Sequence, residues 1–140
     1  MDVRVYYEDT DAAGIVYHAN YLKYFERART EYLREQGFSV AELAANGHIF
    51  PVIRMEIDLT SPARHDDLLT ISTIPVRVGG SCFTLRQLVQ RSGEEKVLVE
   101  ALVTLACVGM TMKAKRIPSE VRQMLEFGTG DRGPGTGKRF

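Results

Sequence analysis

The sequence predicts an α+β fold in which one long helix packs on an antiparallel sheet. Residues 20–36 carry apolar side chains at a helical period, and most of residues 52–112 alternate apolar and polar side chains as strands do. Short turns join these strand-like segments, and strands joined so closely are antiparallel. Because one helix cannot cover both faces of the sheet, and open sheet edges remain, we expect a homo-oligomer.

The first segment, "VRVYY" at 3–7, predicts a short strand that runs into a polar loop ending near His18. The helix at 20–36 follows, and Gly37 suits a left-handed C-terminal cap. Its apolar face is predicted to consist of Tyr21, Leu22, Phe25, Ala28, Tyr32 and Leu33.

Arg29 interrupts this apolar face, and Glu26 lies one turn before it. The structural interpretation is a partly buried ion pair that fixes the helix against the sheet. The alternative is a contact with a neighbouring subunit or with the active-site loop.

A shorter helix is predicted at 39–47, with Ser39 as its N-cap and Gly47 as its end. Strands are predicted at 52–60, 68–78, 82–91 and 96–112, with a bulge or edge position near Pro75 and both faces of the last strand covered. A terminal helix follows at 118–127. The predicted domain spans 1–127, and residues 128–140, with five glycines among thirteen, are expected to be a disordered tail.

Composition restricts the class of function. The 18 basic and 18 acidic residues cancel, and no basic cluster stands out, so nucleic-acid binding is not expected. The longest apolar run, at 101–110, is too short to span a bilayer, which predicts a cytoplasmic protein without membrane insertion. Cys82 and Cys107 lack ligand-spaced partners and are expected to be buried thiols, and no metal site is expected.

The stretch "YYEDTDAAGIVYHANY" at 6–21 holds three acids, Glu8, Asp9 and Asp11. Acids at such a position often only cap backbone N–H groups. "DTDAAG" also matches the start of a calcium loop, but Ala13 stands where a third oxygen ligand belongs and Asn20 where the bidentate glutamate belongs. A phosphotransferase with an aspartate nucleophile would need a buried parallel strand, which the predicted topology lacks.

Acyl transfer suits this stretch better. The loop ends at the N-terminus of the longest helix, where free N–H groups near Tyr17 and His18 could hold an oxyanion. An acid earlier on the same loop could act on the carbonyl carbon as nucleophile or as general base. A thioester fits a site with so few reactive groups, because its leaving thiol, with a pKa of about 8.5, needs little general-acid catalysis. No other hydrolase motif is visible in the sequence.

Residues 3–34, from "VRVYYEDTDAAG" to "YHANYLKYFERARTEYLR", closely resemble the signature of the hotdog-fold acyl-CoA thioesterases of the 4-hydroxybenzoyl-CoA thioesterase type, in the bacterial branch associated with the Tol-Pal system. The similarity continues through "PARHDDLLTI" and "TMKAKRIP" to about residue 127. It implies one long central helix wrapped by a curved antiparallel sheet of five to six strands, and a homodimer or homotetramer with active sites between subunits. The "DTDAAGIVYHANY" spacing resembles this branch rather than the dehydratase-type hotdog proteins.

The resemblance implies that Asp11 and His18 are catalytic, Asp11 as nucleophile or general base and His18 through its backbone N–H and its side chain. The substrate is an acyl-CoA, and no separate cofactor is implied. Other implied partners are acyl carrier protein and Tol-Pal-linked envelope proteins. The alternative function is a noncatalytic module that binds acyl-CoA or acyl carrier protein. The residues assigned to substrate binding are Tyr17, Asn20, Arg64 and Arg77, with Lys113 and Lys115 as further candidates for the coenzyme A phosphates.

Overall fold

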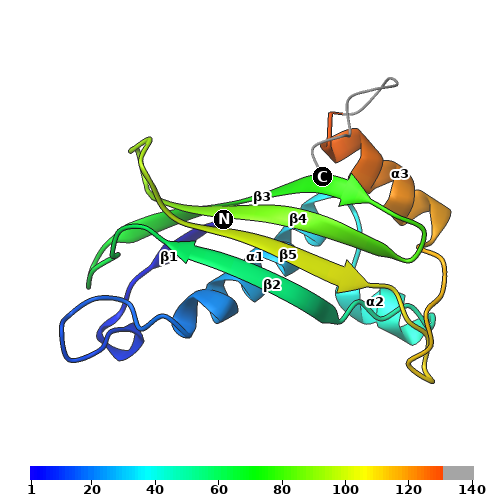
Figure 1. Ribbon diagram of the computed structural model, residues 1–140, viewed down its shortest axis with the longest axis horizontal. Helices are drawn as coiled ribbons and strands as arrows, with labels where there is room; N and C mark the ends of the chain where they lie inside the picture. The colour runs from blue at the N-terminus through cyan, green and yellow to red at the C-terminus, as the bar shows by residue number, and fades with distance from the viewer. Residues whose placement is uncertain (131–140) are drawn as a thin grey trace.

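The computed structural model describes residues 1–130 and consists of one five-stranded antiparallel sheet with three helices (Figure 1). The strands lie in the order β1-β3-β4-β5-β2, so β1 and β2 are the two edges. The α+β prediction is confirmed. The strands are β1 (Asp2–Arg4), β2 (Val52–Leu59), β3 (Leu68–Val78), β4 (Cys82–Arg91) and β5 (Val97–Ala106), and the helices are α1 (Asn20–Glu35), α2 (Val40–Ala45) and α3 (Ser119–Gly128).

Most local predictions for the helices and turns hold. Gly37 and Gly47 have φ values of 91° and 85°, as their roles after two helices require. Ser39 caps α2 by accepting the Glu42 N–H. The β3–β4 register shifts between Pro75 and Arg77, where the proline has no N–H to donate. The terminal helix runs to Gly128, and the remainder of the predicted tail, residues 131–140, lies outside the described residues.

Two strands are shorter than the ranges predicted from the sequence. β1 ends at Arg4, and Tyr7–Asp9 form a 3-10 turn that starts the loop toward α1. β5 ends at Ala106, because the chain then turns back: Val108 bridges to both Ile49 and Ala114, and Met112 has a positive φ of 64°. The apolar composition of residues 107–112 therefore does not indicate a continued strand.

The apolar face of α1 packs against the sheet (Figure 1). Its buried residues are Tyr21, Tyr24, Phe25 and Ala28, which follow the helical spacing of three, four and seven. Leu22 was predicted on this face, but it is 44% exposed in the single chain. It lies a further 100° around the helix from Tyr21, outside the arc of the buried residues.

A buried glutamine joins α1 to the centre of the sheet. Gln87 on β4 is fully buried, and its Nε2 donates to the Phe25 carbonyl at 3.0 Å and to Thr73 Oγ1 at 3.1 Å. Its Oε1 accepts a hydrogen bond from Arg29 at 3.1 Å. Arg29 is thus held by an amide, and the predicted ion pair with Glu26 does not form within 4.0 Å among residues 1–130.

The sheet face opposite α1 is polar in part. On β5, Ala101 and Val103 are buried, while Glu100, Leu102 and Thr104 alternate with them and are half-buried. Glu100 forms an ion pair with Arg86 of β4. The prediction that both faces of the last strand are covered is therefore not met within one chain. Among residues 1–130, no helix is long and apolar enough to cross a bilayer.

Replacing Gln87 tests the buried amide anchor. Gln87→Leu leaves Arg29 half-buried without its acceptor, so we expect a loss of about 2–3 kcal/mol in the free energy of unfolding, measured by urea denaturation. Gln123→Leu, an exposed glutamine on α3, is the matched control and should change stability by less than about 0.5 kcal/mol. Equal effects of the two substitutions would show that the anchor contributes little.

Candidate active site

The loop between β1 and α1 is folded back onto the start of the helix. The Asp9 carbonyl accepts hydrogen bonds from the Tyr17 N–H at 2.9 Å and from the Asn20 side-chain amide at 2.8 Å. Thr10 and Val16 pair as an isolated antiparallel bridge. The acidic stretch and the helix start are therefore held side by side, although the intervening residues belong to no helix or strand.

Asp11 sits at the tip of this folded loop. Its N–H donates to the Ile15 carbonyl at 2.9 Å, and its Oδ1 accepts the Ala13 N–H at 2.8 Å. Gly14 completes the turn with a φ of 79°, a conformation that favours glycine. The Asp11 side chain is exposed, and Oδ2 has no hydrogen bond within residues 1–130. One carboxylate oxygen thus orients the group, and the other is available for chemistry.

The helix start offers fewer free N–H groups than the sequence predicts. The Tyr17 N–H already donates to Asp9, so it cannot bind an oxyanion without breaking that bond. The N–H groups of His18 and Ala19 have no acceptor within the described chain, and Ala19 provides no side-chain cap. His18 N–H and Ala19 N–H are therefore the donors that the positive end of α1 presents.

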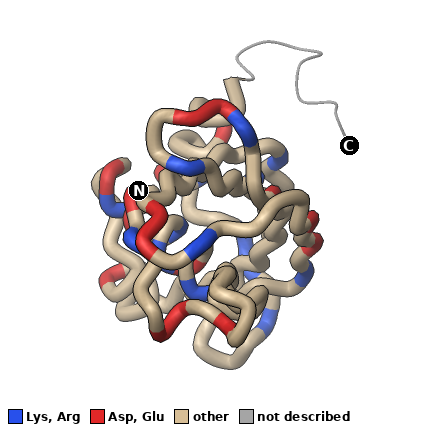
Figure 2. Tube along the Cα trace, turned by 90° about the vertical axis from the view of Figure 1, so that its left-hand side faces the viewer, with Lys and Arg blue, Asp and Glu red and all other residues tan. Residues whose placement is uncertain are grey.

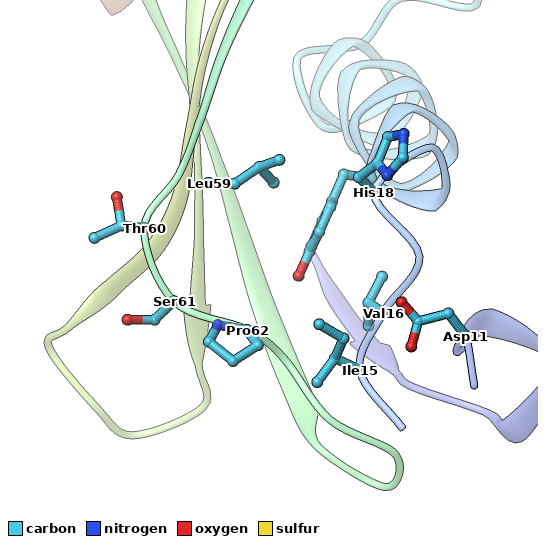
Figure 3. A pocket seen from close by; sticks show the side chains of 9 residues that line it. Asp11, Ile15, Val16, His18, Leu59, Thr60, Ser61 and Pro62 are labelled. Atoms are coloured by element: carbon cyan, nitrogen blue, oxygen red, sulfur yellow. The ribbon is translucent and has the colours of Figure 1, made fainter. Parts of the chain in front are cut away.

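A cavity of about 280 Å³ lies next to these groups (Figure 3). Figure 3 shows two walls, the folded loop with the start of α1 on one side and the segment that follows β2 on the other. The lining residues are Asp11, Ile15, Val16, His18, Tyr21, Leu59, Thr60, Ser61 and Pro62. We call this space the Asp11 cavity.

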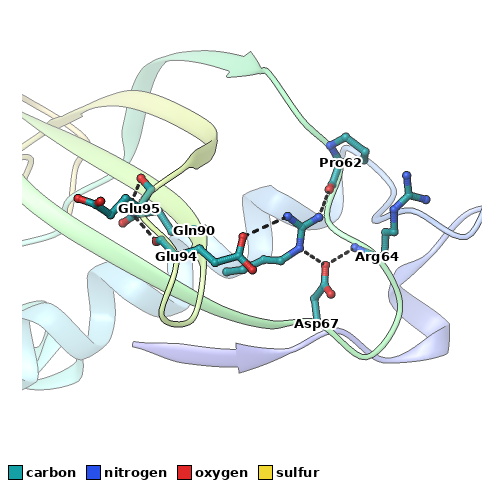
Figure 4. Close-up of polar contacts among 7 residues, drawn as sticks. Pro62, Arg64, Asp67, Gln90, Glu94 and Glu95 are labelled. Atoms are coloured by element: carbon teal, nitrogen blue, oxygen red, sulfur yellow. Dashed lines mark hydrogen bonds and ion pairs between the residues drawn. The ribbon is translucent and has the colours of Figure 1, made fainter.

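The second wall is fixed by a polar network (Figure 4). Arg91 of β4 donates to Asp67 Oδ2 at 2.9 Å and to the Pro62 carbonyl at 2.9 Å. The same Asp67 oxygen accepts the Arg64 N–H at 2.8 Å. The two walls are then joined directly, since the Val16 N–H donates to the Ala63 carbonyl at 2.9 Å.

The structure brings some of the predicted site residues together. Asp11 and His18 line the same cavity, and the Tyr17 and His18 rings lie 4.5 Å apart at the helix start. Asn20 is adjacent, but its amide is bonded to Asp9, so in the single chain it holds the loop in place. Arg64 is exposed beside the cavity, where its backbone bridges to Ile15.

The other predicted basic residues lie elsewhere. Arg77 is near the opposite end of β3, about 30 Å along the strand from Leu68, which borders the Arg64 loop. Lys115 donates to the Gly47 carbonyl, near the end of α2. Neither residue is beside the Asp11 cavity of its own chain.

Sequence reasoning did not identify the second wall. Leu59, Thr60 and Ser61 lie far from Asp11 along the chain, and their residue types carry no chemical signal. Tyr21 was predicted only as a core residue, but it also lines the cavity, and burial raises the pKa of its hydroxyl, partly offset by a hydrogen bond with the Ala63 backbone. These contributions arise from the antiparallel topology, which returns β2 to the start of α1.

Charge is spread evenly around this region. Figure 2 shows acidic and basic positions interspersed along the chain. Within residues 1–130, no three histidine, cysteine or acidic side chains gather as a metal ion would require. The reactive groups present are thus a carboxylate, free backbone N–H groups and a histidine.

Comparison with known proteins agrees with this arrangement. Residues 13–98 match the family model described as "Thioesterase superfamily". The chain is 42% identical over 120 residues to the Escherichia coli protein named "Acyl-CoA thioester hydrolase YbgC", covering 85% of this chain and 89% of that protein. It is 44% identical over 122 residues to "Acyl-CoA thioesterase YbgC" of Haemophilus influenzae, covering 86% and 88%. A crystal structure of a probable thioesterase from Bartonella henselae superposes with a TM-score of 0.78 at 41% identity, covering 84% of this chain and 97% of that one.

Amide hydrogen exchange tests the geometry of the helix start. We expect the Tyr17 N–H to be protected by Asp9, while the N–H groups of His18 and Ala19 exchange rapidly because they lack acceptors. Asn20→Ala should accelerate exchange at Tyr17 and lower stability by about 1 kcal/mol. The assignment would be contradicted if NMR exchange rates showed the His18 N–H to be more protected than the Tyr17 N–H.

Proposed function

Because the chain belongs to the thioesterase superfamily, we propose that this thioester hydrolase cleaves an acyl-CoA to a free carboxylic acid and coenzyme A in the Asp11 cavity. The observation that carries the proposal is the pairing of a loop carboxylate with the unoccupied N–H groups at the start of α1. The names of the relatives at 42% and 44% identity, an acyl-CoA thioester hydrolase and an acyl-CoA thioesterase, support acyl-CoA as the substrate class.

In this proposal the thioester carbonyl oxygen accepts the His18 N–H, whose position at the helix N-terminus favours developing negative charge. Asp11 Oδ2 then either attacks the carbonyl carbon or removes a proton from an attacking water. The tetrahedral intermediate collapses by breaking the C–S bond, and the thiolate of coenzyme A leaves. Direct attack leaves an acyl–Asp11 anhydride for water to cleave, whereas the water route gives the acid in one step.

The other assignments concern binding. Arg64, exposed beside the cavity mouth, is the basic residue best placed to meet a coenzyme A phosphate, while Tyr17 adds an exposed ring at the helix start. Coenzyme A belongs to the substrate, so the reaction needs no further cofactor. We place the protein in the cytoplasm, with acyl carrier protein and Tol-Pal-linked envelope proteins as its proposed partners.

Asp11→Asn tests the catalytic assignment. The amide keeps the shape of the side chain but is neither base nor nucleophile, so we expect kcat to fall at least about 100-fold with little change in KM. Thiol release from a panel of short, long and aromatic acyl-CoAs measures this. Asp2→Asn, at an exposed aspartate of β1 that does not line the cavity, is the matched control and should retain activity.

The same assay addresses the alternative of a noncatalytic binding module. Such a module would bind acyl-CoA in a calorimetric titration and release no thiol. If the wild-type protein releases thiol and a folded Asp11→Asn variant releases it at the same rate, the role of Asp11 is overturned but the thioesterase activity is not.

The edge strand β2 supports a dimer as the working unit. β2 is the last strand of the sheet, and no strand among residues 1–130 pairs with its outer edge. Ile53 and Leu59 of β2 are 59% and 56% exposed. Such an edge invites aggregation unless a partner covers it. Antiparallel pairing of two β2 strands about a two-fold axis would join two sheets into one. Pairs of such dimers would give the tetramer.

Ile53→Glu tests this interface. In the dimer the partner would cover residue 53, so a carboxylate there would be buried without an ion-pair partner. The dimer should therefore dissociate, as measured by size-exclusion chromatography with light scattering. Met110→Glu, in an exposed loop, is the control and should leave the mass unchanged. A monomeric wild-type protein would contradict the dimer but would leave Asp11 chemistry standing.

A further inference from the structure

Asp9 precedes Asp11 by two residues, and both its side chain and its backbone are held by the protein. Its carboxylate oxygen Oδ2 accepts the Tyr6 N–H at 2.9 Å, across the 3-10 turn that starts the loop. Its carbonyl accepts the Tyr17 N–H and the Asn20 side-chain amide. Asp9 is half-buried and does not line the Asp11 cavity. The first aspartate of the loop is therefore engaged by the protein, whereas the second faces the cavity.

Tyr24 of α1 lies beside the same aspartate. It follows Asn20 by four residues, one helical turn further along the same face of α1. Its side chain is 2% exposed, and its hydroxyl is shielded from solvent and makes no hydrogen bond of acceptable geometry within residues 1–130. Burial raises the pKa of this hydroxyl, and the neighbouring Asp9 carboxylate raises it further. A buried hydroxyl without a partner is uncommon, and the Asp9 carboxylate is an acceptor able to satisfy it.

The position of Asp9 determines two features of the site. Because the Asp9 carbonyl takes the Tyr17 N–H, the N–H of His18 is left as a donor at the helix start. Asp11 is only two residues further along the loop, and two residues of chain span at most about 7 Å. A shift of Asp9 would therefore move the Asp11 carboxylate relative to the His18 N–H. A misplacement of about 1 Å is enough to lower a reaction rate by roughly two orders of magnitude.

We propose that Asp9 and Tyr24 form a positioning pair that holds Asp11 within reach of a thioester bound at the His18 N–H. Neither member of the pair lines the cavity, so Asp9 acts through the loop and Tyr24 acts through Asp9. The inference rests on the proposed function. It divides the two aspartates of "DTD" into a positioning residue, Asp9, and a reacting residue, Asp11.

Substitutions at Asp9 test the assignment. Asp9→Ala removes the acceptor of the Tyr6 N–H and the carboxylate beside Tyr24, so we expect kcat for thiol release to fall roughly 10- to 100-fold, with KM within about twofold of the wild-type value. Asp9→Asn should keep kcat within about threefold, because the amide oxygen can accept the Tyr6 N–H and the amide N–H can donate to the Tyr24 hydroxyl. Glu8→Ala, at the exposed acid one residue earlier, is the matched control and should match the wild type.

Urea denaturation of the same variants separates positioning from stability. A merely structural Asp9 would lower the free energy of unfolding in Asp9→Ala and leave kcat per folded molecule unchanged, which would overturn the positioning role. A loss in Asp9→Asn as large as that in Asp9→Ala would also overturn it, because the negative charge rather than the hydrogen bonds would then be required.

A double-mutant cycle tests the pairing of Asp9 with Tyr24. Tyr24→Phe removes only the hydroxyl, and we expect kcat to fall roughly three- to tenfold, the effect of about one hydrogen bond, with KM unchanged. In Asp9→Ala/Tyr24→Phe the loss should equal that of Asp9→Ala alone, because the hydroxyl acts through Asp9. Tyr32→Phe, at a half-buried tyrosine of α1 that does not line the cavity, is the matched control and should keep the wild-type kcat.

Two results of this cycle would overturn the pair. One is a double variant in which the two losses multiply, and the other is a Tyr24→Phe variant with the wild-type kcat. Tyr24→Phe keeps the packed ring, so the second result stays measurable if Asp9→Ala fails to fold.

The outcomes separate this inference from the proposed function. No thiol release by the wild-type protein from any acyl-CoA would refute the function itself. Efficient hydrolysis that neither Asp9→Ala nor Tyr24→Phe alters would refute the positioning pair and leave the thioesterase assignment intact. Loss of activity in Asp9→Asn but not in Asp11→Asn would exchange the roles of the two aspartates and overturn the inference.

Discussion

The packing of α1 on the sheet is the constraint from which the other features of the structure follow. Phe25 and Ala28 of α1 are buried in one core with side chains of β3 and β4, and the fully buried Gln87 bonds to the Phe25 carbonyl. A polar group buried at this depth is stable only when each of its hydrogen bonds is made, so the anchor tolerates little sliding of the helix. This fixes where the N-terminus of α1 lies relative to the end of β2.

That position creates the site. The helix start needs acceptors for its free N–H groups, and the folded loop supplies one for Tyr17 through Asp9 while leaving His18 without one in the described chain. The same loop carries Asp11, and the Arg91–Asp67 network holds the facing wall. A carboxylate and an electropositive helix end therefore meet across a small cavity, which suits a substrate with a good leaving group.

The single chain leaves the outer edge of β2 uncovered among residues 1–130. β2 contributes Leu59 to the Asp11 cavity, and it also carries the exposed Ile53. A dimer through this edge would cover these apolar residues, and Leu59 would then lie close to both the interface and the Asp11 cavity.

Local patterns in the sequence were sufficient for the fold class, the extent of α1, the turn at Gly37 and the choice of the Asp11–His18 stretch as the candidate site. These features depend on periodicity, caps and spacing, which a linear sequence displays. The same patterns could not show that Arg29 bonds to Gln87 rather than Glu26, that the Tyr17 N–H is already used, or that β5 ends at Ala106.

The far wall of the cavity, at Leu59 to Pro62, became visible only in three dimensions. Its position depends on which distant segments the sheet brings together, and neither residue type nor spacing along the chain predicts that contact. The linear sequence therefore offered a candidate carboxylate, whereas long-range packing supplied its surroundings.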